Sequence, residues 1–196
     1  MPLDHTWSRY HGPVFPLFLR LTGRTVVVVG AGSVGTRKIA ELREAGANVR
    51  VVARDASEEV RALAAKRAIT LELREFRAGD LDDAWLVIAA TNDGESNRVV
   101  AAAAETRRIF CNAVDDPPNA SAYFGAILRR PPFLVVISSS GEVPALSRLL
   151  REVLESALPP ERWIESARAL RRTWKAEGTP MNERFGQLVA LIARGS

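Results

Sequence analysis

The feature that most constrains the fold is a run of five β-branched residues that leads into a glycine-rich loop. The run, Thr25-Val-Val-Val-Val-Gly30, is apolar without alternation, which is typical of a strand buried on both faces of a parallel sheet. The loop that follows, Gly30-Ala31-Gly32-Ser33-Val34-Gly35, fits the pattern G-x-G-x-x-G. A helical pattern with Ile39 and Leu42 on one face comes next. This order predicts the first β-α-β unit of a dinucleotide-binding sheet.

Each glycine of the loop has its own physical task in such a unit. Gly30 allows the tight turn, Gly32 lets a pyrophosphate approach the backbone, and Gly35 allows the helix to pack closely on the strand. The helix N-terminus offers backbone N–H groups and a partial positive charge to the phosphates. A structural turn without a ligand is the alternative. The predicted cofactor-binding residues of this loop are Gly30, Ala31, Gly32, Ser33, Val34 and Gly35.

Strands and helices alternate from residue 25 to residue 114, which indicates an α/β fold with a Rossmann-like doubly wound parallel sheet. The further strands are predicted over 48–53, 69–73, 85–90 and 109–113. One helix is predicted over 95–106, and another runs to about Lys66 from a capping box formed by Asp55 and Glu58. We assign residues 1–114 to this dinucleotide-binding Rossmann domain.

The alternation ends after Val114, at the turn-forming segment Asp115-Asp116-Pro117-Pro118-Asn119. Two strands are predicted over 121–128 and 133–138 with no room for a crossover helix between them, so residues 115–142 form a small β unit. Residues 143–196 are predicted to form a helical C-terminal domain. Its helices are expected over 145–158, 161–175 and 181–194, with Pro144 in the first turn.

Composition narrows the function classes. Apolar runs are too short to span a membrane, residues 1–13 show no signal-peptide pattern, and Cys111 is the single cysteine, so a cytoplasmic location is expected. The net charge is +4, and 24 of the 27 basic residues are arginine. Arginine binds carboxylates and phosphates in a bidentate manner, which suggests an acidic ligand, although genome composition also explains the excess. No basic segment interleaved with aromatic residues indicates nucleic-acid binding.

Two loops at the predicted carboxyl edge of the sheet carry further candidate cofactor ligands. Asp55 lies about 20 residues after the third glycine, where an acid that binds the ribose hydroxyls of NAD is expected, but it also serves as a helix cap. Arg54 would suit the 2′-phosphate of NADP, so the sequence leaves the two cofactors open. Thr91, Asn92 and Asp93 follow the fourth strand beside the cofactor, and Asp93 is equally suited to cap the next helix.

Several ordered segments resemble the precorrin-2 dehydrogenase family, including the dehydrogenase and ferrochelatase half of siroheme synthase. The resemblance covers about residues 14–158. The segments are Phe15-Pro16-Leu17-Phe18, Val29-Gly30-Ala31-Gly32 with Arg37-Lys38, Ala89-Ala90-Thr91-Asn92-Asp93, Phe110-Cys111-Asn112-Ala113-Val114-Asp115, and Ile137-Ser138-Ser139-Ser140-Gly141 through Pro144-Ala145-Leu146 with Arg148-Leu149-Leu150-Arg151.

The resemblance implies NAD-dependent oxidation of precorrin-2, a tetrapyrrole with many carboxylates, to sirohydrochlorin. In some relatives Fe²⁺ is then inserted, so iron would enter as a substrate only. It also implies a homodimer in which the β unit over 115–142 contacts its partner. The family's catalytic aspartate corresponds to Asp115, for which a turn role is the alternative. The family's serine near the tetrapyrrole corresponds to Ser139, although the segment here reads Ser-Ser-Ser-Gly-Glu where the family has more glycine. Asn112, in the segment that ends at Asp115, is a further candidate substrate ligand. Arg148 could bind a substrate carboxylate, with a solvated or salt-bridged arginine as the alternative.

Three alternative functions explain less of the sequence than this family does. A short-chain reductase needs a tyrosine four residues before a lysine, and neither Tyr10 nor Tyr123 meets that requirement. A non-enzymatic domain that senses dinucleotides would explain the glycine loop but not the segment that ends at Asp115. A relative that only inserts metal would not need the glycine loop. Because His5 and His11 both lie in the N-terminal tail, a histidine-built metal site is not expected.

Overall fold

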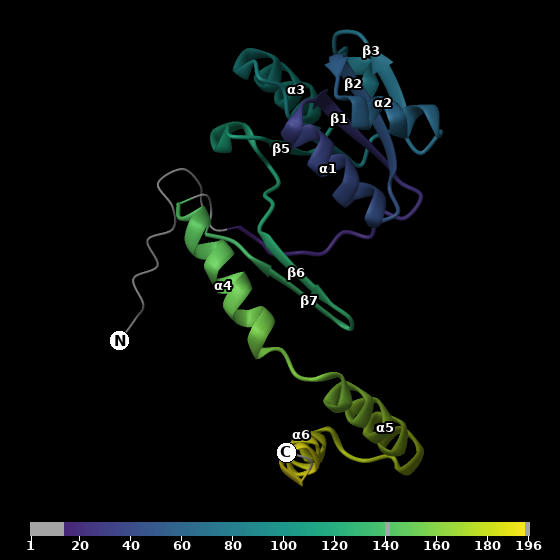
Figure 1. Ribbon diagram of the computed structural model, residues 1–196, viewed down its shortest axis with the longest axis vertical. Helices are drawn as coiled ribbons and strands as arrows, with labels where there is room; N and C mark the ends of the chain where they lie inside the picture. The colour runs from purple at the N-terminus through teal and green to yellow at the C-terminus, as the bar shows by residue number, and fades with distance from the viewer. Residues whose placement is uncertain (1–13, 140–141, 195–196) are drawn as a thin grey trace. The chain divides into compact units, whose positions relative to one another are not determined.

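The computed structural model describes residues 14–139 and 142–194. Its main sheet has five parallel strands in the order β3-β2-β1-β4-β5, which is the strand order of a Rossmann fold (Figure 1). The predicted Rossmann-like class is therefore confirmed. The strands are β1 (Thr25–Ala31), β2 (Asn48–Ala56), β3 (Thr70–Leu73), β4 (Leu86–Ala89) and β5 (Phe110–Ala113).

Helices cover both faces of this sheet because alternate residues of each central strand are buried on opposite sides. On one face, Val26 and Val28 of β1 pack with Ile39 of α1 (Ser33–Glu44) and Val60 of α2 (Glu58–Ala65). On the other face, Val27 and Val29 form a cluster with the alanine-rich α3 (Gly94–Thr106). The uninterrupted valine run of β1 thus reflects a strand with two buried faces.

The start of α1 lies against the end of β1 so closely that side chains are excluded. A Cβ atom on Gly35 would lie 2.3 Å from the carbonyl oxygen of Gly30, and one on Gly30 would lie 2.4 Å from the carbonyl oxygen of Ala90. Gly30 also has a φ of +102°, which L side chains rarely adopt. Two of the three motif glycines are therefore required by packing and backbone conformation.

The predicted capping box at Asp55 and Glu58 is wrong. β2 continues through Ala56, and Ser57 is the N-cap of α2, where its hydroxyl accepts a hydrogen bond from the backbone N–H of Val60. The Asp55 carboxylate accepts hydrogen bonds from the Ala56 backbone N–H (2.8 Å) and from the Arg61 guanidinium (2.6 Å). These two contacts lower the pKa of Asp55.

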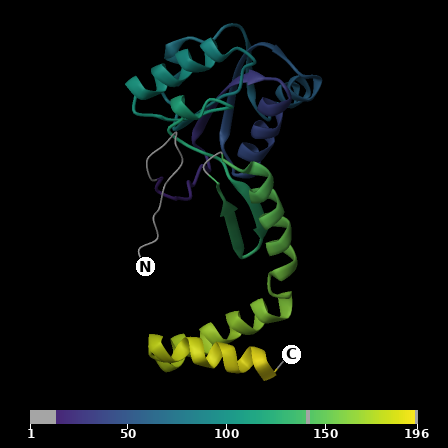
Figure 2. The ribbon, with the colours of Figure 1, turned by 90° about the vertical axis from the view of Figure 1, so that its left-hand side faces the viewer.

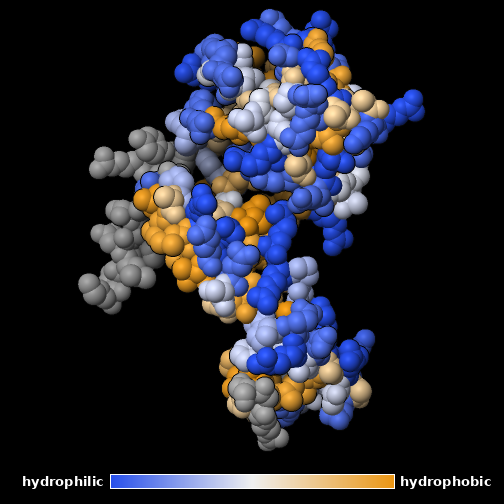
Figure 3. All heavy atoms as spheres, in the orientation of Figure 1, coloured by the Kyte–Doolittle hydropathy of each residue, from blue (hydrophilic) through white to orange (hydrophobic). Residues whose placement is uncertain are grey.

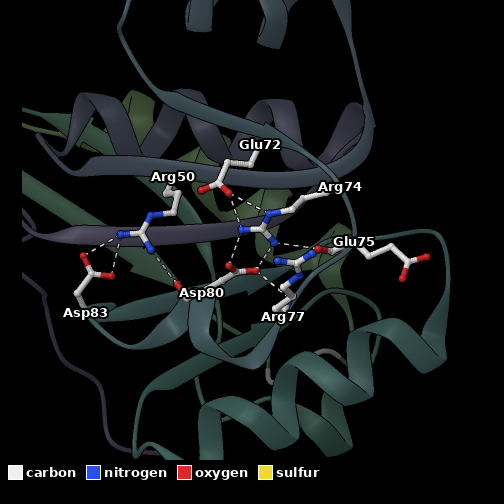
Figure 4. Close-up of polar contacts among 7 residues, drawn as sticks. All are labelled: Arg50, Glu72, Arg74, Glu75, Arg77, Asp80 and Asp83. Atoms are coloured by element: carbon white, nitrogen blue, oxygen red, sulfur yellow. Dashed lines mark hydrogen bonds and ion pairs between the residues drawn. The ribbon is translucent and has the colours of Figure 1, made fainter.

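An ion-pair cluster fastens the segment that follows β3 (Figure 4). Arg74 donates to both carboxylate oxygens of Asp80, at 2.8 and 2.6 Å, and also to the Glu72 carboxylate. Asp80 lies in the short 3-10 helix η1 (Ala78–Leu81), where its side chain is 9% exposed and also accepts the backbone N–H of Arg77. The Arg74 hydrogen bonds hold the pKa of Asp80 below its ordinary value.

The chain divides into two compact units. One contains the Rossmann sheet and extends to Ala126, with Ser138–Ser147; the other contains Ile127–Ile137 and the chain from Arg148 onward. These boundaries differ from the three parts predicted from the sequence, which are residues 1–114, 115–142 and 143–196. That three-part division stays a prediction. The last short 3-10 helix of the first unit is η2 (Pro117–Asn119).

The remaining elements are a two-stranded sheet and three helices. The hairpin pairs β6 (Ala126–Arg130) with β7 (Phe133–Ile137), so its first strand begins later than the predicted 121–128. The helices are α4 (Pro144–Ala157), α5 (Glu161–Glu177) and α6 (Met181–Arg194). Figure 2 shows α5 and α6 side by side, and the Trp174 indole N–H donates to Gln187 between them (2.6 Å). No helix in the described ranges is long and apolar enough to cross a membrane.

We predict that Asp80→Asn lowers the free energy of unfolding by about 2 kcal/mol, because it removes a charged partner of Arg74 from a half-enclosed cluster. Asp82→Asn is the control, since Asp82 pairs with Arg107 while remaining 71% exposed. Urea unfolding of the full-length chain measures both.

The same pair predicts a pH dependence. A carboxyl whose pKa is lowered by folding contributes stability above its unfolded pKa, near 3.8, and loses that contribution as the pH falls through the lower native value. The difference between wild type and Asp80→Asn should therefore be constant near neutral pH and shrink below about pH 4. A difference that grows on acidification would contradict this account.

Candidate nucleotide site and catalytic carboxylate

The carboxyl ends of β1, β4 and β5 enclose a cavity of about 440 Å³ within the first unit. Parallel strands place the loops that follow them at one edge of the sheet, which is where ligands bind in this class of fold. The glycine loop, the Thr91 loop and the segment after β5 each contribute to its wall. The lining residues are Gly32, Ser33, Val34, Ala90, Thr91, Asn92, Gly94, Asn97, Arg98, Val114, Asp115 and Asp116.

The N-terminus of α1 fits the pyrophosphate of a dinucleotide. Its N-cap is Gly32, which has no side chain to cap the helix, and its first turn contains no acidic residue. A Cβ on Gly32 would meet no atom within 4 Å, so the space in front of the helix is open where a phosphate would approach. Open space, backbone N–H groups and the helix dipole together suit a bound anion.

A buried amide holds the loop after β4. Asn97 of α3 is 4% exposed, and its side-chain oxygen accepts hydrogen bonds from the Thr91 backbone N–H (3.1 Å) and hydroxyl (2.8 Å). Its amide N–H₂ group donates to the Thr91 carbonyl (3.1 Å). Asn97 was not among the residues predicted from the sequence. A polar residue at a position that the helical pattern buries, six residues after Thr91, was the available signal.

Asp93 is the N-cap of α3. Its carboxylate accepts hydrogen bonds from the backbone N–H groups of Glu95 (3.3 Å) and Ser96 (3.0 Å). Hydrogen bonds from the Ser96 hydroxyl and backbone are the main causes that lower the pKa of Asp93. The capping role is thus present, while a role in cofactor binding stays a prediction.

A second cavity, of about 750 Å³, lies beside the glycine loop at the end of β2. Its described lining includes the predicted residues Gly30, Ala31, Asp55 and Asp93, together with Arg54. Residues 74–76, which follow β3, also line it and were missed by the sequence analysis. Because nothing in their composition resembles a binding motif, only their place after a strand could have indicated them.

Asp115 lies at the wall of the first cavity with an unusual backbone. Its φ is +56°, in the left-handed region that aspartate, asparagine and glycine adopt more readily than other residues. The side chain is exposed, and no hydrogen bond or ion pair within residues 14–139 and 142–194 engages its carboxylate. By contrast, the neighbouring Asp116 accepts two hydrogen bonds from the Asn119 amide (3.0 and 2.8 Å).

The three predicted substrate-binding residues are not among the described residues that line this cavity. Asn112 is buried and donates to the Ala122 carbonyl (2.9 Å), and Ser139 accepts the backbone N–H of Val143 (3.2 Å) ahead of α4. Arg148 is exposed and pairs with Glu152 (3.1 Å). Their roles toward substrate stay predictions.

No cluster of metal-ligating side chains is found among the described residues, and the single cysteine, Cys111, is buried. No group of three or more histidine, cysteine, aspartate and glutamate side chains in residues 14–139 and 142–194 could hold a metal ion. His5 and His11 lie outside the described residues. Residues 1–13, for which no signal peptide was predicted, also lie outside them. Burial raises the pKa of the Cys111 thiol to about 11, so the sulfur stays protonated at neutral pH.

Comparison with known proteins places this site in a family. Residues 17–126 match the model of a family described as "Putative NAD(P)-binding". Siroheme synthase 1 of Yersinia enterocolitica is 42% identical over 92% of this chain and 40% of its own length, and a siroheme synthase of Neisseria meningitidis serogroup C is 42% identical over 89% of this chain and 39% of its own length. The chain thus spans about two fifths of these relatives.

A solved structure described as "SirC, precorrin-2 dehydrogenase" superposes with a TM-score of 0.72 at 24% identity, covering 91% of this chain and 89% of that one. At 24% identity this match shows that the two proteins share a fold. It agrees with the Rossmann sheet, the small hairpin and the C-terminal helices described above. With the family model and the siroheme synthases, it confirms the resemblance inferred from the ordered motifs. The chain belongs to the NAD(P)-binding family that its glycine loop and parallel sheet indicate.

Proposed function

We propose that this chain is a precorrin-2 dehydrogenase, which oxidises precorrin-2 to sirohydrochlorin in siroheme biosynthesis with NAD as the oxidant. The observation that carries the proposal is the uncommitted Asp115 carboxylate at a cavity that it shares with the dinucleotide-type glycine loop. The siroheme synthases and the precorrin-2 dehydrogenase among the similar proteins support the choice of substrate.

Different residues of the chain bind different parts of the dinucleotide in this proposal. Gly32, Ser33 and Val34 present the α1 N-terminus to the pyrophosphate, and Asp55 binds a ribose hydroxyl of NAD. Asn97 positions the Thr91 loop against the nicotinamide half through its three hydrogen bonds. When bound, the nicotinamide supplies hydride acceptance.

Asp115 supplies proton chemistry. Oxidation of the macrocycle removes a hydride from one saturated carbon and a proton from a neighbouring carbon. A carboxylate without an internal partner, exposed at the cavity wall, is available to accept that proton. In the proposed mechanism Asp115 is the general base, and the hydrogen bonds of Asp116 to Asn119 hold the adjacent turn. Asn112, Ser139 and Arg148 are proposed to bind substrate, with Arg148 exchanging Glu152 for a substrate carboxylate.

Exposed apolar side chains support the homodimer that the family resemblance implies. Phe133, Leu134 and Val136 of β7 are exposed, which is unusual for a short hairpin. Along α4 an exposed stripe recurs at helical spacing, and orange side chains gather over this helix in Figure 3. The stripe consists of Leu146, Leu149, Leu150, Val153 and Leu154.

The direct test is anaerobic incubation of the purified chain with precorrin-2 and NAD⁺, following NADH formation and the tetrapyrrole spectrum. Turnover would establish the dehydrogenase. Dinucleotide binding without turnover, with either NAD⁺ or NADP⁺, would contradict the enzyme proposal and favour a sensing domain. Adding Fe²⁺ after turnover then tests for metal insertion.

For the carboxylate, we predict that Asp115→Asn lowers kcat by about a hundredfold or more, because the amide cannot accept the proton. Asparagine also tolerates a positive φ, so the substitution should not disturb the backbone. NADH affinity should be unchanged. The matched control is Asp116→Asn, for which we expect only a few-fold loss. Equal losses in both variants would mean that Asp115 has no special role.

For the loop, we predict that Asn97→Ala weakens NADH binding about tenfold and lowers stability by about 2 kcal/mol, since Thr91 loses three hydrogen bonds to a buried amide. Thr91→Val removes the hydroxyl bonds and leaves the two backbone bonds, so its binding loss should be smaller. Calorimetric titration and urea unfolding measure the two effects. A stability loss without weaker NADH binding would exclude a positioning role.

For the dimer, we predict that Leu149→Asp shifts the chain toward monomer in sedimentation equilibrium, because the charge enters the exposed apolar stripe of α4. Glu155→Lys changes the charge on the opposite, exposed face of this helix and should leave the association unchanged. If both variants associate as the wild type does, this face is not the interface.

A further inference from the structure

The charged side chains that line the second cavity bear on whether it accepts NAD or NADP. In a Rossmann sheet the end of β2 faces the adenosine ribose, and here this cavity is lined by residues from β2 and from the segment after β3. Among its described lining residues, four carry carboxylates and two carry guanidinium groups. The carboxylates are those of Asp55, Glu75, Asp93 and Glu95, and the guanidinium groups are those of Arg54 and Arg74.

Both arginines are already engaged. Arg74 is held by Glu72 and by the nearly buried Asp80. Arg54 forms an ion pair with Glu75 at 3.0 Å, with both side chains largely exposed to solvent. A 2′-phosphate that enters this cavity would therefore have to displace a carboxylate from Arg54 before it could gain a cation.

Hydrogen bonds made by Arg74 hold the main chain at Glu75 close to Arg54. The Arg74 backbone N–H donates to the carbonyl of Ala53, the residue directly before Arg54 (2.9 Å), and the Arg74 guanidinium donates to the Glu75 carbonyl (2.9 Å). Figure 4 shows that the Glu75 side chain points away from the cluster that fastens its backbone. The cluster thus holds the main chain of residue 75 and leaves its carboxylate for the cavity.

We propose that Glu75 is a specificity-determining residue, which disfavours NADP by occupying Arg54, the cation that would otherwise bind the 2′-phosphate. This inference rests on the proposed function, because it concerns the same nucleotide site. The 2′-hydroxyl of NAD is neutral and can donate a hydrogen bond to a carboxylate, whereas the 2′-phosphate of NADP is repelled by carboxylates. Asp93, on the cavity wall, adds to the same field.

The experiment measures dissociation constants of NADH and NADPH for the full chain by calorimetric titration, without substrate. Glu75→Gln should strengthen NADPH binding about fivefold, the scale of one solvent-exposed ion pair, and leave NADH binding within about twofold. Glu95→Gln is the charge-matched control. It removes one carboxylate from the same cavity, but that carboxylate pairs with Arg98 (2.7 Å) and leaves the Arg54 pair intact. Its NADPH gain should be smaller than about twofold.

The variant Arg54→Ala and the double variant Glu75→Gln, Arg54→Ala complete a double-mutant cycle. If the released Arg54 binds the 2′-phosphate, the NADPH gain of Glu75→Gln should disappear in the double variant. An equal gain in Glu95→Gln, or a gain that persists without Arg54, would overturn the assignment of Glu75. Wild-type binding of NADPH as tight as that of NADH would overturn the inference while leaving dinucleotide binding intact. Failure to bind either nucleotide would overturn the proposed function as well.

Discussion

The close approach of the first helix to the first strand is the constraint on which the site depends. Where α1 begins, the backbone at Gly35 lies against the carbonyl of Gly30, and Gly30 lies against the backbone at Ala90. These contacts leave no room for a Cβ atom on either glycine. They bring the N–H groups of α1, the end of β1 and the loop after β4 together, so a small cavity with backbone donors forms at the carboxyl edge of the sheet. A larger residue at either position would separate the parts that bind the phosphates.

Around this edge, most polar side chains are engaged in holding the loops. Asn97 binds the Thr91 loop, Asp93 caps α3, and Asn112 binds the Ala122 carbonyl. Such contacts satisfy polar groups at loop ends, and they fix the loops that form the cavity. Asp115 differs, since no contact within the described ranges engages its carboxylate. A rigid surround with one uncommitted acid is an arrangement suited to proton transfer.

The sequence predicted the fold well because the signals were local. The valine run, the glycine loop and the regular alternation of strands and helices determine a parallel sheet almost independently of tertiary detail. The predicted capping box at Asp55 was wrong because β2 runs three residues further than the predicted strand, so that Ser57 is the N-cap of α2. Residues such as Asn97 and Glu75 could not be predicted as part of the site. The sequence marks Asn97 only as a polar residue at a buried helical position, and Glu75 only as a residue that follows a strand. Their roles depend on contacts with Thr91 and Arg54, which the fold brings near.

The left-handed backbone at Asp115 has a consequence for which acid can occupy this position. Aspartate adopts a positive φ more readily than glutamate does. Glutamate would offer the same carboxylate chemistry on a longer and less ordered arm, together with added strain. The geometry of the turn after β5 therefore favours aspartate over glutamate at the cavity wall, independently of any requirement of catalysis.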